Sequence, residues 1–325
     1  MDRRALITIV SGSILAAPLA GLAQPSASVP RVGVIHHGGD WHLWLEGLRQ
    51  GLRELGLEEG RHVVLDIRET KGDLKAVEVA ARDLERGKVA LLCTAATSVT
   101  LAVKLATTHT PIVFFVGSDP VTARLVEGFG KPGGRLTGVH NRLLDLTGKR
   151  LEILKEMLPK LARVVTFYDP SNRVAKEGVR LGREAGQQLG VQLVERRVSS
   201  VEELRVGLGG LKPQDVDAYF YTPDAMVGSQ SQLIIDAAKA KRLPTMFHEV
   251  GRVAKGALAS YGYNYREAGR MSAKYVQRVL AGTPPKDLPV ESYDKIEFSL
   301  NQRTAREIGL TIPPLLLLRA DQIIG

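Results

Sequence analysis

Short apolar runs alternate with amphipathic segments along most of the chain. The runs at 89–94 and 111–116 are bounded by polar residues, which is typical of strands buried on both faces. Between such runs, apolar residues recur every three or four positions, as they do on the buried side of a surface helix. In 89–120 two of these runs flank one helical segment. That stretch predicts a strand–helix–strand unit with a right-handed crossover.

The alternation occurs twice, which predicts two lobes. One series begins at 31–35 and a second at Asp145. The C-terminal elements are too few for a third domain, so we expect chain crossings near 139–141 and 260–264. A chain of 325 residues is long enough for two domains of about 150 residues each. We therefore predict an α/β fold with two doubly wound parallel-sheet lobes joined by a hinge: 30–139 plus 263–290, and 140–262 plus 291–325.

The first 23 residues are predicted to be a signal peptide rather than part of the fold. Arg3 and Arg4 precede an apolar stretch that ends in Gly21-Leu22-Ala23, which fits cleavage near Ala23. A membrane anchor is less favoured, because Ser, Gly and Pro residues interrupt that stretch. The paired arginines are compatible with either a Sec or a twin-arginine signal. We expect a protein exported to the periplasm.

Charge and cysteine usage narrow the classes of partner. Lys and Arg outnumber Asp and Glu by 44 to 35, but the basic residues are spread along the chain. A nucleic-acid binder would cluster them on one helix or arm, so we expect no nucleic-acid partner. The excess charge instead favours an anionic ligand. Cys93 is the single cysteine, which rules out an intrachain disulfide and the common cysteine metal motifs.

Polar side chains follow two neighbouring strands of the predicted first lobe. Thr97 and Ser98 open a helix after one strand, and Ser118 and Asp119 follow the next. A helix N-terminus carries unpaired N–H groups and a partial positive charge, and open α/β sheets bind ligands at the carboxyl ends of their strands. We predict an anion site at Thr97 and Ser98. The alternative is that these residues only cap a helix and form a turn.

Enzyme and metal motifs are absent from the sequence. There is no G-x-G-x-x-G after the first strand, no P-loop and no G-x-S-x-G. His248-Glu249 lacks the second histidine of a zinc protease, and adjacent His36-His37 on a turn is a poor metal site. The sequence leaves open a catalytic triad of Ser118, His140 and Asp169, although no motif singles out these residues. We expect no catalytic activity, no cofactor and no metal.

Motifs in both predicted lobes resemble one known family. They are Arg31-Val-Gly-Val-Ile35, Thr97-Ser98, Ser118-Asp119-Pro120, Gly138-Val139, Tyr168-Asp169-Pro-Ser-Asn172, and the segments 257–263 and 304–321. Together with the export signal, they resemble the substrate-binding proteins of ABC importers, in the tryptophan/tyrosine-type branch. The resemblance covers nearly all of the chain after the signal peptide, and its C-terminal part is the most specific.

The resemblance implies a type I periplasmic binding protein fold with three hinge crossings and a ligand clamped between two lobes. It also implies a membrane permease and an ATPase as partners, and we expect a monomer. The candidate ligand-binding residues follow predicted strands or lie in the crossings: Trp41, Thr97, Ser98, Ser118, Asp119, Asn141, Asp169, Asn172, Asp224, His248 and Tyr261.

Two departures from the family pattern leave the ligand class open. Members that bind amino acids usually have Asp-Asn where this chain has Asp224-Ala225, so the carboxylate that could face an ammonium group is kept and an amide is lost. Trp41 stands in the turn after the first strand, where it could stack on a planar ligand or begin the core of its helix. The ligand is therefore amino acid-like, or an aromatic carboxylate without an ammonium group. A regulator domain of the same fold is less favoured, because an export signal stands where a helix-turn-helix would be.

Overall fold

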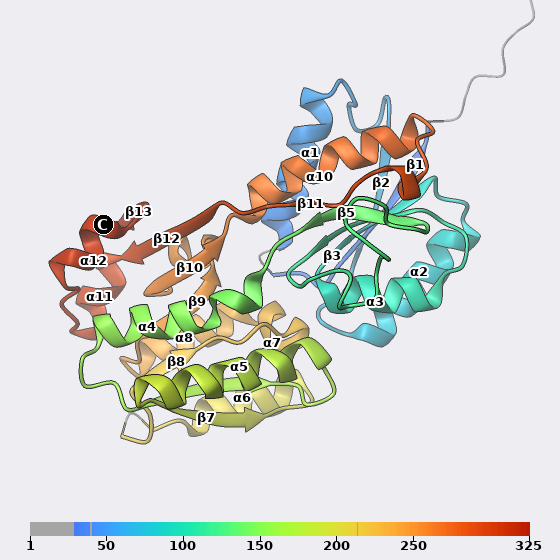
Figure 1. Cartoon of the computed structure of the whole chain (residues 1–325). Coiled ribbons are helices and arrows are strands. Elements are labelled where there is room, and N and C mark those ends of the chain that lie inside the picture. The colour runs from blue at the N-terminus through green and yellow to red at the C-terminus, as the bar shows by residue number, and fades with distance from the viewer. Residues whose placement is uncertain (1–28, 40, 213) are drawn as a thin grey trace, which may run out of the picture.

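The computed structural model describes residues 29–39, 41–212 and 214–325, and the predicted signal peptide lies outside these ranges. Two sheets form two lobes, with strand orders β11-β5-β4-β3-β1-β2 and β13-β12-β10-β9-β8-β6-β7 (Figure 1). Every pairing of named strands is parallel except that between β10 and β12. The predicted fold class, with two mostly parallel sheets, is confirmed. Within the described ranges, no helix is long and apolar enough to cross a membrane.

The first lobe packs helices on both faces of its sheet, because its strands are apolar on both faces. Its sheet comprises β1 (Arg31–His36), β2 (Val64–Glu69), β3 (Leu91–Ala95), β4 (Ile112–Val116), β5 (Leu136–His140) and β11 (Glu291–Ser292). One face packs on α1 (Trp41–Glu54) and α10 (Tyr265–Leu280), and the other on α2 (Leu74–Arg86) and α3 (Thr97–Ala106); η2 (Pro285–Asp287) precedes β11.

The second lobe repeats this layering. Its strands are β6 (Arg163–Tyr168), β7 (Gln192–Arg197), β8 (Ala218–Phe220), β9 (Thr245–Glu249), β10 (Ala259–Tyr263), β12 (Ile296–Asn301) and β13 (Gln322–Ile324). One face packs on α4 (Thr147–Met157), α5 (Arg173–Leu189), α11 (Gln302–Ile308) and α12 (Pro314–Arg319). The other packs on α6 (Val201–Gly210), α7 (Ala225–Ser229) and α8 (Ser231–Ala240), while η1 (Leu143–Leu146) and α9 (Gly251–Ala254) are short connecting turns.

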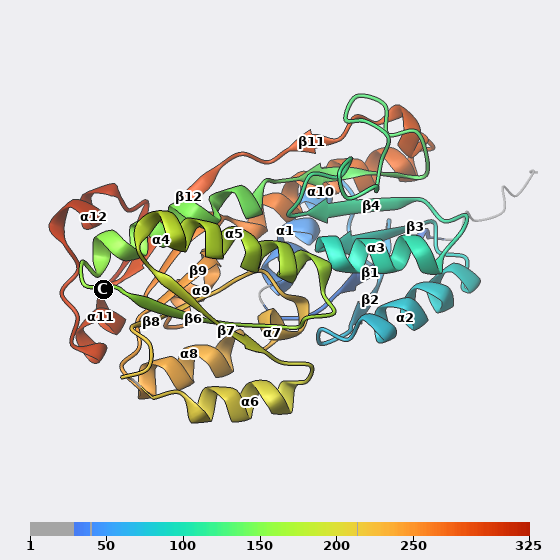
Figure 2. The ribbon, with the colours of Figure 1, turned by 60° about the horizontal axis from the view of Figure 1, so that its bottom comes forward.

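The chain passes between the sheets three times, after β5, after β10 and between β11 and β12. Figure 2 shows the last of these as an extended segment that runs from one lobe to the other. The first passage follows β5, which ends at His140, and the second follows β10, which ends at Tyr263. β11 pairs with β5 in the first sheet, so the third passage comes a few residues after the predicted boundary at 290. A strand of two residues, Glu291 and Ser292, has no apolar run that sequence reasoning could detect.

Helices α1 and α10 are in backbone contact, although more than 200 residues separate them in sequence. A Cβ atom on Gly269 would lie 1.9 Å from the Trp44 carbonyl oxygen, and one on Gly47 would lie 1.8 Å from the Arg266 carbonyl oxygen. Only glycine permits this approach, since both distances are far inside van der Waals contact. The contact fixes α10 to the first lobe, so the first residues of the two helices, Trp41 and Tyr265, stand next to each other.

Candidate functional site

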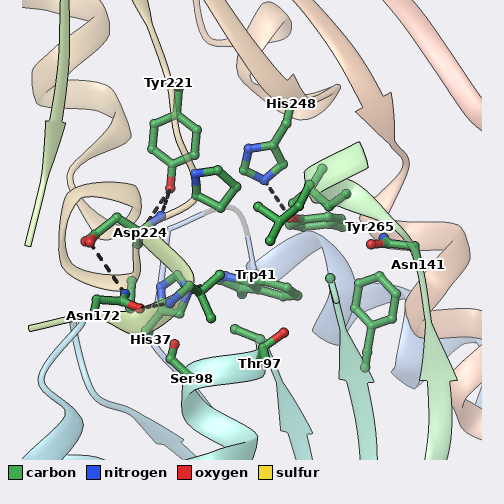
Figure 3. Close-up of a pocket in the computed structure, with 18 of the residues that line it drawn as sticks. His37, Trp41, Thr97, Ser98, Asn141, Asn172, Tyr221, Asp224, His248 and Tyr265 are labelled. Atoms are coloured by element: carbon green, nitrogen blue, oxygen red, sulfur yellow. Dashed lines mark hydrogen bonds between the residues drawn. The ribbon is translucent and has the colours of Figure 1, made fainter. Parts of the chain in front are cut away.

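A cavity of about 50 Å³ lies between the lobes at the ends of several parallel strands (Figure 3). The first lobe lines it with His37, Trp41, Ala96, Thr97, Ser98, Phe115, Gly117, Asn141 and Tyr265, and the crossing adds Leu143 and Leu144. The second lobe lines it with Asn172, Val174, Tyr221, Pro223, Asp224, Ala225, His248 and Arg252. An open groove of about 770 Å³ adjoins the cavity and shares four of its lining residues. The cleft therefore has a small inner part and a wide outer part.

Aromatic rings of the first lobe form one wall of the cavity. The rings of Trp41 and Tyr265 stack with centroids 4.4 Å apart and planes at 22°, and Phe115 meets both edge-on. The Trp41 indole Nε1 donates a hydrogen bond of 2.6 Å to His37 Nε2. Trp41 is only 8 % exposed and belongs to the first-lobe core. Trp41 is thus both a core residue and part of the cavity wall. The sequence had left both of these roles open.

The second lobe places another stacked pair opposite. The rings of Tyr221 and His248 lie 5.0 Å apart with planes at 29°, and the Arg252 guanidinium lies 4.3 Å from the Tyr221 ring centroid. Arg252 is buried and its Nε lies 3.4 Å from a carboxylate oxygen of buried Glu249. The His248 Nε2 and the Tyr265 hydroxyl are hydrogen-bonded at 2.8 Å. Since these two residues belong to different lobes, this bond links the lobes across the cavity.

The polar end of the cavity is the N-terminus of α3. Ala96 holds φ 85° and ψ 143°, and no side chain caps the helix there. The Thr97 and Ser118 hydroxyl oxygens are hydrogen-bonded at 3.0 Å, and Ser98 is half-buried. An uncapped helix start offers N–H donors and a partial positive charge to an anion. Thr97 and Ser98 lie across the cavity from Tyr221 and His248 (Figure 3).

Asn141 adds an unused acceptor beside this end. It is 1 % exposed, and its Oδ1 has no hydrogen-bond partner among the described residues. Buried amide oxygens almost always accept a hydrogen bond. A donor on a molecule held in the cavity would satisfy it.

Asp224 lies in the cavity wall but is tied into its own lobe. Its Oδ1 accepts from the Val227 N–H at 2.9 Å, and its Oδ2 accepts from the Asp169 N–H at 3.0 Å and from Asn172 Nδ2 at 3.4 Å. Burial raises the pKa of this carboxyl to about 6, against the lowering effect of those backbone bonds. Asp224 therefore caps α7.

The predicted ligand residues separate into three groups. The cavity is lined by Trp41, Thr97, Ser98, Asn141, Asn172, Asp224 and His248. The outer groove is lined by Ser118 and Asp119, and Asp119 Oδ1 accepts from the N–H groups of the next turn. Neither space is lined by Asp169 or Tyr261. Asp169 Oδ1 accepts from the Ser171 N–H, and Tyr261 packs edge-on against Phe298 at 6.2 Å on the core side of its strand.

Sequence reasoning missed several residues of the cavity wall. His37 and Tyr221 directly follow or end predicted strands, so their position at strand ends could have identified them. Phe115 lies inside an apolar strand and looks like any other core residue. Tyr265 and Arg252 begin helices whose place beside the cavity depends on the tertiary packing, for which the sequence carries no local signal.

The three residues of the open catalytic alternative do not meet. Ser118 bonds to Thr97, Asp169 lies in the second-lobe network of Asp224, and the His140 ring packs at a tilt against Phe129, with ring centroids 5.0 Å apart. They form no nucleophile–base–acid chain of the kind that acyl transfer needs.

One cluster has the composition of a metal site. The possible ligand atoms of His36, His42 and Glu69 all lie within 4.8 Å of one another. The Gly38 N–H donates to His36 Nδ1 at 3.0 Å, and burial lowers the pKa of His36 to about 4. The ring is therefore neutral with its proton on Nε2, the buried nitrogen that faces no acceptor in the described chain. Coordination through Nε2 would require that proton to leave and the Gly38 bond to break, so the cluster does not fit a metal ion as it stands.

Comparisons with known proteins agree with this architecture. A protein of Clostridioides difficile (strain R20291) named tyrosine-binding protein is 26 % identical over 266 residues, which cover 82 % of this chain and 76 % of that protein. The crystal structure of an ABC domain in complex with L-Trp from Streptococcus pneumonia has a TM-score of 0.80 and 25 % identity, with 91 % of this chain and 100 % of that chain covered.

A conserved domain protein of Vibrio cholerae matches with a TM-score of 0.82 and 27 % identity, over 91 % of this chain and 99 % of that one. These structures share the two-lobed periplasmic binding protein fold expected from the sequence. Residues 32–324 match the family described as ABC transporter substrate binding protein. With that match and the two-lobed cavity, the chain belongs to the ABC transporter substrate binding protein family.

Proposed function

We propose that this protein is the exported binding component of an ABC importer and that it closes its two lobes around a small ligand carrying a carboxylate and an aromatic ring. The observation that carries the proposal is the cavity between the lobes, which combines two stacked aromatic pairs with an uncapped helix start. Relatives named for tyrosine binding or solved with L-Trp support an aromatic ligand. The ligand would be delivered to a membrane permease driven by an ATPase, which family membership supports.

The ligand carboxylate is assigned to the first lobe. The N–H groups at the start of α3 and the hydroxyls of Thr97 and Ser98 are hydrogen-bond donors beside a positive helix end. The ring is assigned to the space between the Trp41–Tyr265 pair and the Tyr221–His248 pair, since aromatic faces favour stacked or edge-on ring contacts.

Ligand entry requires the wall to rearrange. A cavity of about 50 Å³ holds a few water molecules, whereas pockets for small organic ligands measure about 300–1,000 Å³. The His248–Tyr265 bond between the lobes must therefore break as the cleft opens. Opening and closing about the three crossings would provide that space and then exclude water.

A ligand screen tests this function. Thermal-shift assays with the amino acids and a set of aromatic carboxylates should give hits that are aromatic and carry a carboxylate, because a ligand at 100 times Kd adds about 2.7 kcal/mol of stability. Sugars serve as the contrasting class. A protein stabilised only by sugars, or by no aromatic acid at any concentration, would contradict the proposal.

Whether the site recognises an ammonium group is decided by a matched ligand pair, L-tryptophan and indole-3-propionate, which differ by the amino group. Binding of L-tryptophan at least tenfold tighter by calorimetry identifies an ammonium site at Asp224 or Asn141 Oδ1, since hydrogen bonds to charged groups contribute about 1.5–3 kcal/mol. Tighter binding of indole-3-propionate identifies the aromatic carboxylate class, which the sequence kept as its alternative.

A further inference from the structure

Arg150 is a fully buried cation without a counter-ion. Its side chain is 0 % exposed, and it lies in the first turn of α4. Nη1 donates to the Leu143 carbonyl at 3.3 Å and Nη2 to the Thr147 hydroxyl at 3.1 Å, while Nε has no partner. In the described part of the chain, it forms no ion pair with a carboxylate, whereas most of the other arginines there do, such as Arg31 with Asp66 and Arg49 with Glu59.

This placement is unfavourable for an isolated folded protein. Removing a charge from water is costly unless a counter-charge and hydrogen bonds compensate it. The positive end of the α4 dipole opposes a second positive charge in the same turn. A ring contact with Phe220 at 5.9 Å offers only weak compensation. Burial lowers the pKa of Arg150 to about 10, so the guanidinium stays charged at neutral pH.

The guanidinium lies directly behind the cavity wall, at the first crossing. Leu143, whose carbonyl it binds, lines the cavity. Solvent is excluded from this region, and a charge there acts over several ångströms with little screening.

We propose that Arg150 determines specificity for anionic ligands, because a negative charge in the cavity supplies the counter-charge that the protein itself lacks. This inference rests on the proposed function and adds to it a reason why acids should be preferred over neutral molecules of the same shape. Arg150 acts through the wall rather than by lining the cavity, so it affects charge selection more than shape selection.

The test compares acids with their amides, using indole-3-acetate with indole-3-acetamide and L-tryptophan with L-tryptophanamide. Calorimetry on the wild-type protein should show a preference for the acid of each pair that binds. Arg150→Met should reduce that preference at least tenfold, and Arg150→Lys should keep most of it. Lys149→Met is the matched control: it removes the same charge from the same turn of α4, but Lys149 is partly exposed and paired with Glu152 at 3.0 Å.

A second readout separates this role from a structural one. Without ligand, Arg150→Met should have a melting temperature equal to or above that of the wild type, since an uncompensated buried charge has been removed. If the methionine variant does not fold, Arg150→Gln carries the affinity test. Equal losses for acid and amide, or an unchanged preference, would overturn the inference and leave the proposed function standing. If the wild type binds none of the four probes, the same comparison is made with the best acid from the screen and its amide, and the absence of any binding acid would overturn both.

Discussion

Ala96 stores backbone strain at the proposed anion site. Its φ of 85° and ψ of 143° lie in a region that residues with a Cβ rarely adopt. The Ala96 N–H is bonded to the Phe115 carbonyl at 3.0 Å, and its carbonyl accepts from the Thr100 N–H at 3.0 Å. These bonds hold the turn in place. The start of α3 is therefore held beside the cavity before a ligand arrives.

Replacing both Thr97 and Ser98 with alanine should weaken binding of the best acid from the screen at least tenfold. Neither hydroxyl caps α3, whose N-cap is Ala96, so the helix should remain intact and the melting temperature should stay within a few degrees. Calorimetry measures the loss, and Thr108→Ala beyond the other end of α3 is the control. An unchanged affinity in the double variant would remove these residues from the site.

Asp224 should make the closed protein less stable as the pH rises. Its folded pKa of about 6 lies above the ordinary value of 3.8, so the fold favours the protonated form. This contribution is fully present below pH 4 and is lost as the pH rises through 6, a difference of about 2–3 kcal/mol.

Asp224→Asn cannot titrate, so its stability relative to the wild type should rise by that amount between pH 4 and pH 7, as measured by urea unfolding. His36 titrates in the same window but is present in both proteins, so its effect cancels. Asp119→Asn, another residue that caps a turn, is the control. A relative stability that does not change with pH would show that Asp224 is ionised throughout.

At the scale of elements, the packing of α1 on α10 positions half of the aromatic wall. Gly269→Ala would place a Cβ 1.9 Å from the Trp44 carbonyl and force the helices apart. Overpacking of this kind costs about 1–3 kcal/mol or more. We expect a clear fall in melting temperature and weaker ligand binding, since the Trp41–Tyr265 stack begins these helices.

Gly209→Ala provides the comparison. It is also a helical glycine, and no heavy atom lies within 4 Å of its added Cβ, so this change should stabilise the protein by about 0.5–1 kcal/mol. Equal effects of the two substitutions would show that the α1–α10 contact is looser than described.

The elements were largely predictable because their signals are local. The alternation of apolar runs and amphipathic segments located both sheets, and the predicted strand–helix–strand unit in 89–120 is formed by β3, α3 and β4. The short helix α7 and the strand β11 were missed, since five and two residues cannot display a period. Cavity residues at strand ends, such as Thr97 and Asn141, could be predicted from the sequence, because open α/β sheets bind ligands there. Tyr265 and Phe115 were not, because only the tertiary contact between distant helices and strands brings them to the cavity.

For the whole molecule, the lobes are in direct contact in this conformation. A Cβ on Gly72 would lie 2.5 Å from Met226 Cα, and the Ser229 hydroxyl donates to the Lys71 carbonyl at 3.3 Å. These contacts join the second and first lobes on the side away from the crossings. The conformation therefore corresponds to the closed state of the proposed clamp.

Small-angle scattering tests the clamp. The protein saturated with its ligand should give a profile that matches this structure, and the ligand-free protein should have a larger radius of gyration. Closing buries the aromatic walls and brings the second-lobe residues to the ligand. Identical profiles with and without ligand would indicate a rigid protein.

The interleaving of the chain between the lobes also has a consequence for biosynthesis. The first lobe needs α10 and β11 from 265–292 to cover and complete its sheet, and the second needs β12 and β13 from 296–324. Neither sheet is complete until nearly the entire polypeptide has left the ribosome. Late completion of both lobes is compatible with the export proposed for this protein, since a secretion channel threads an unfolded chain.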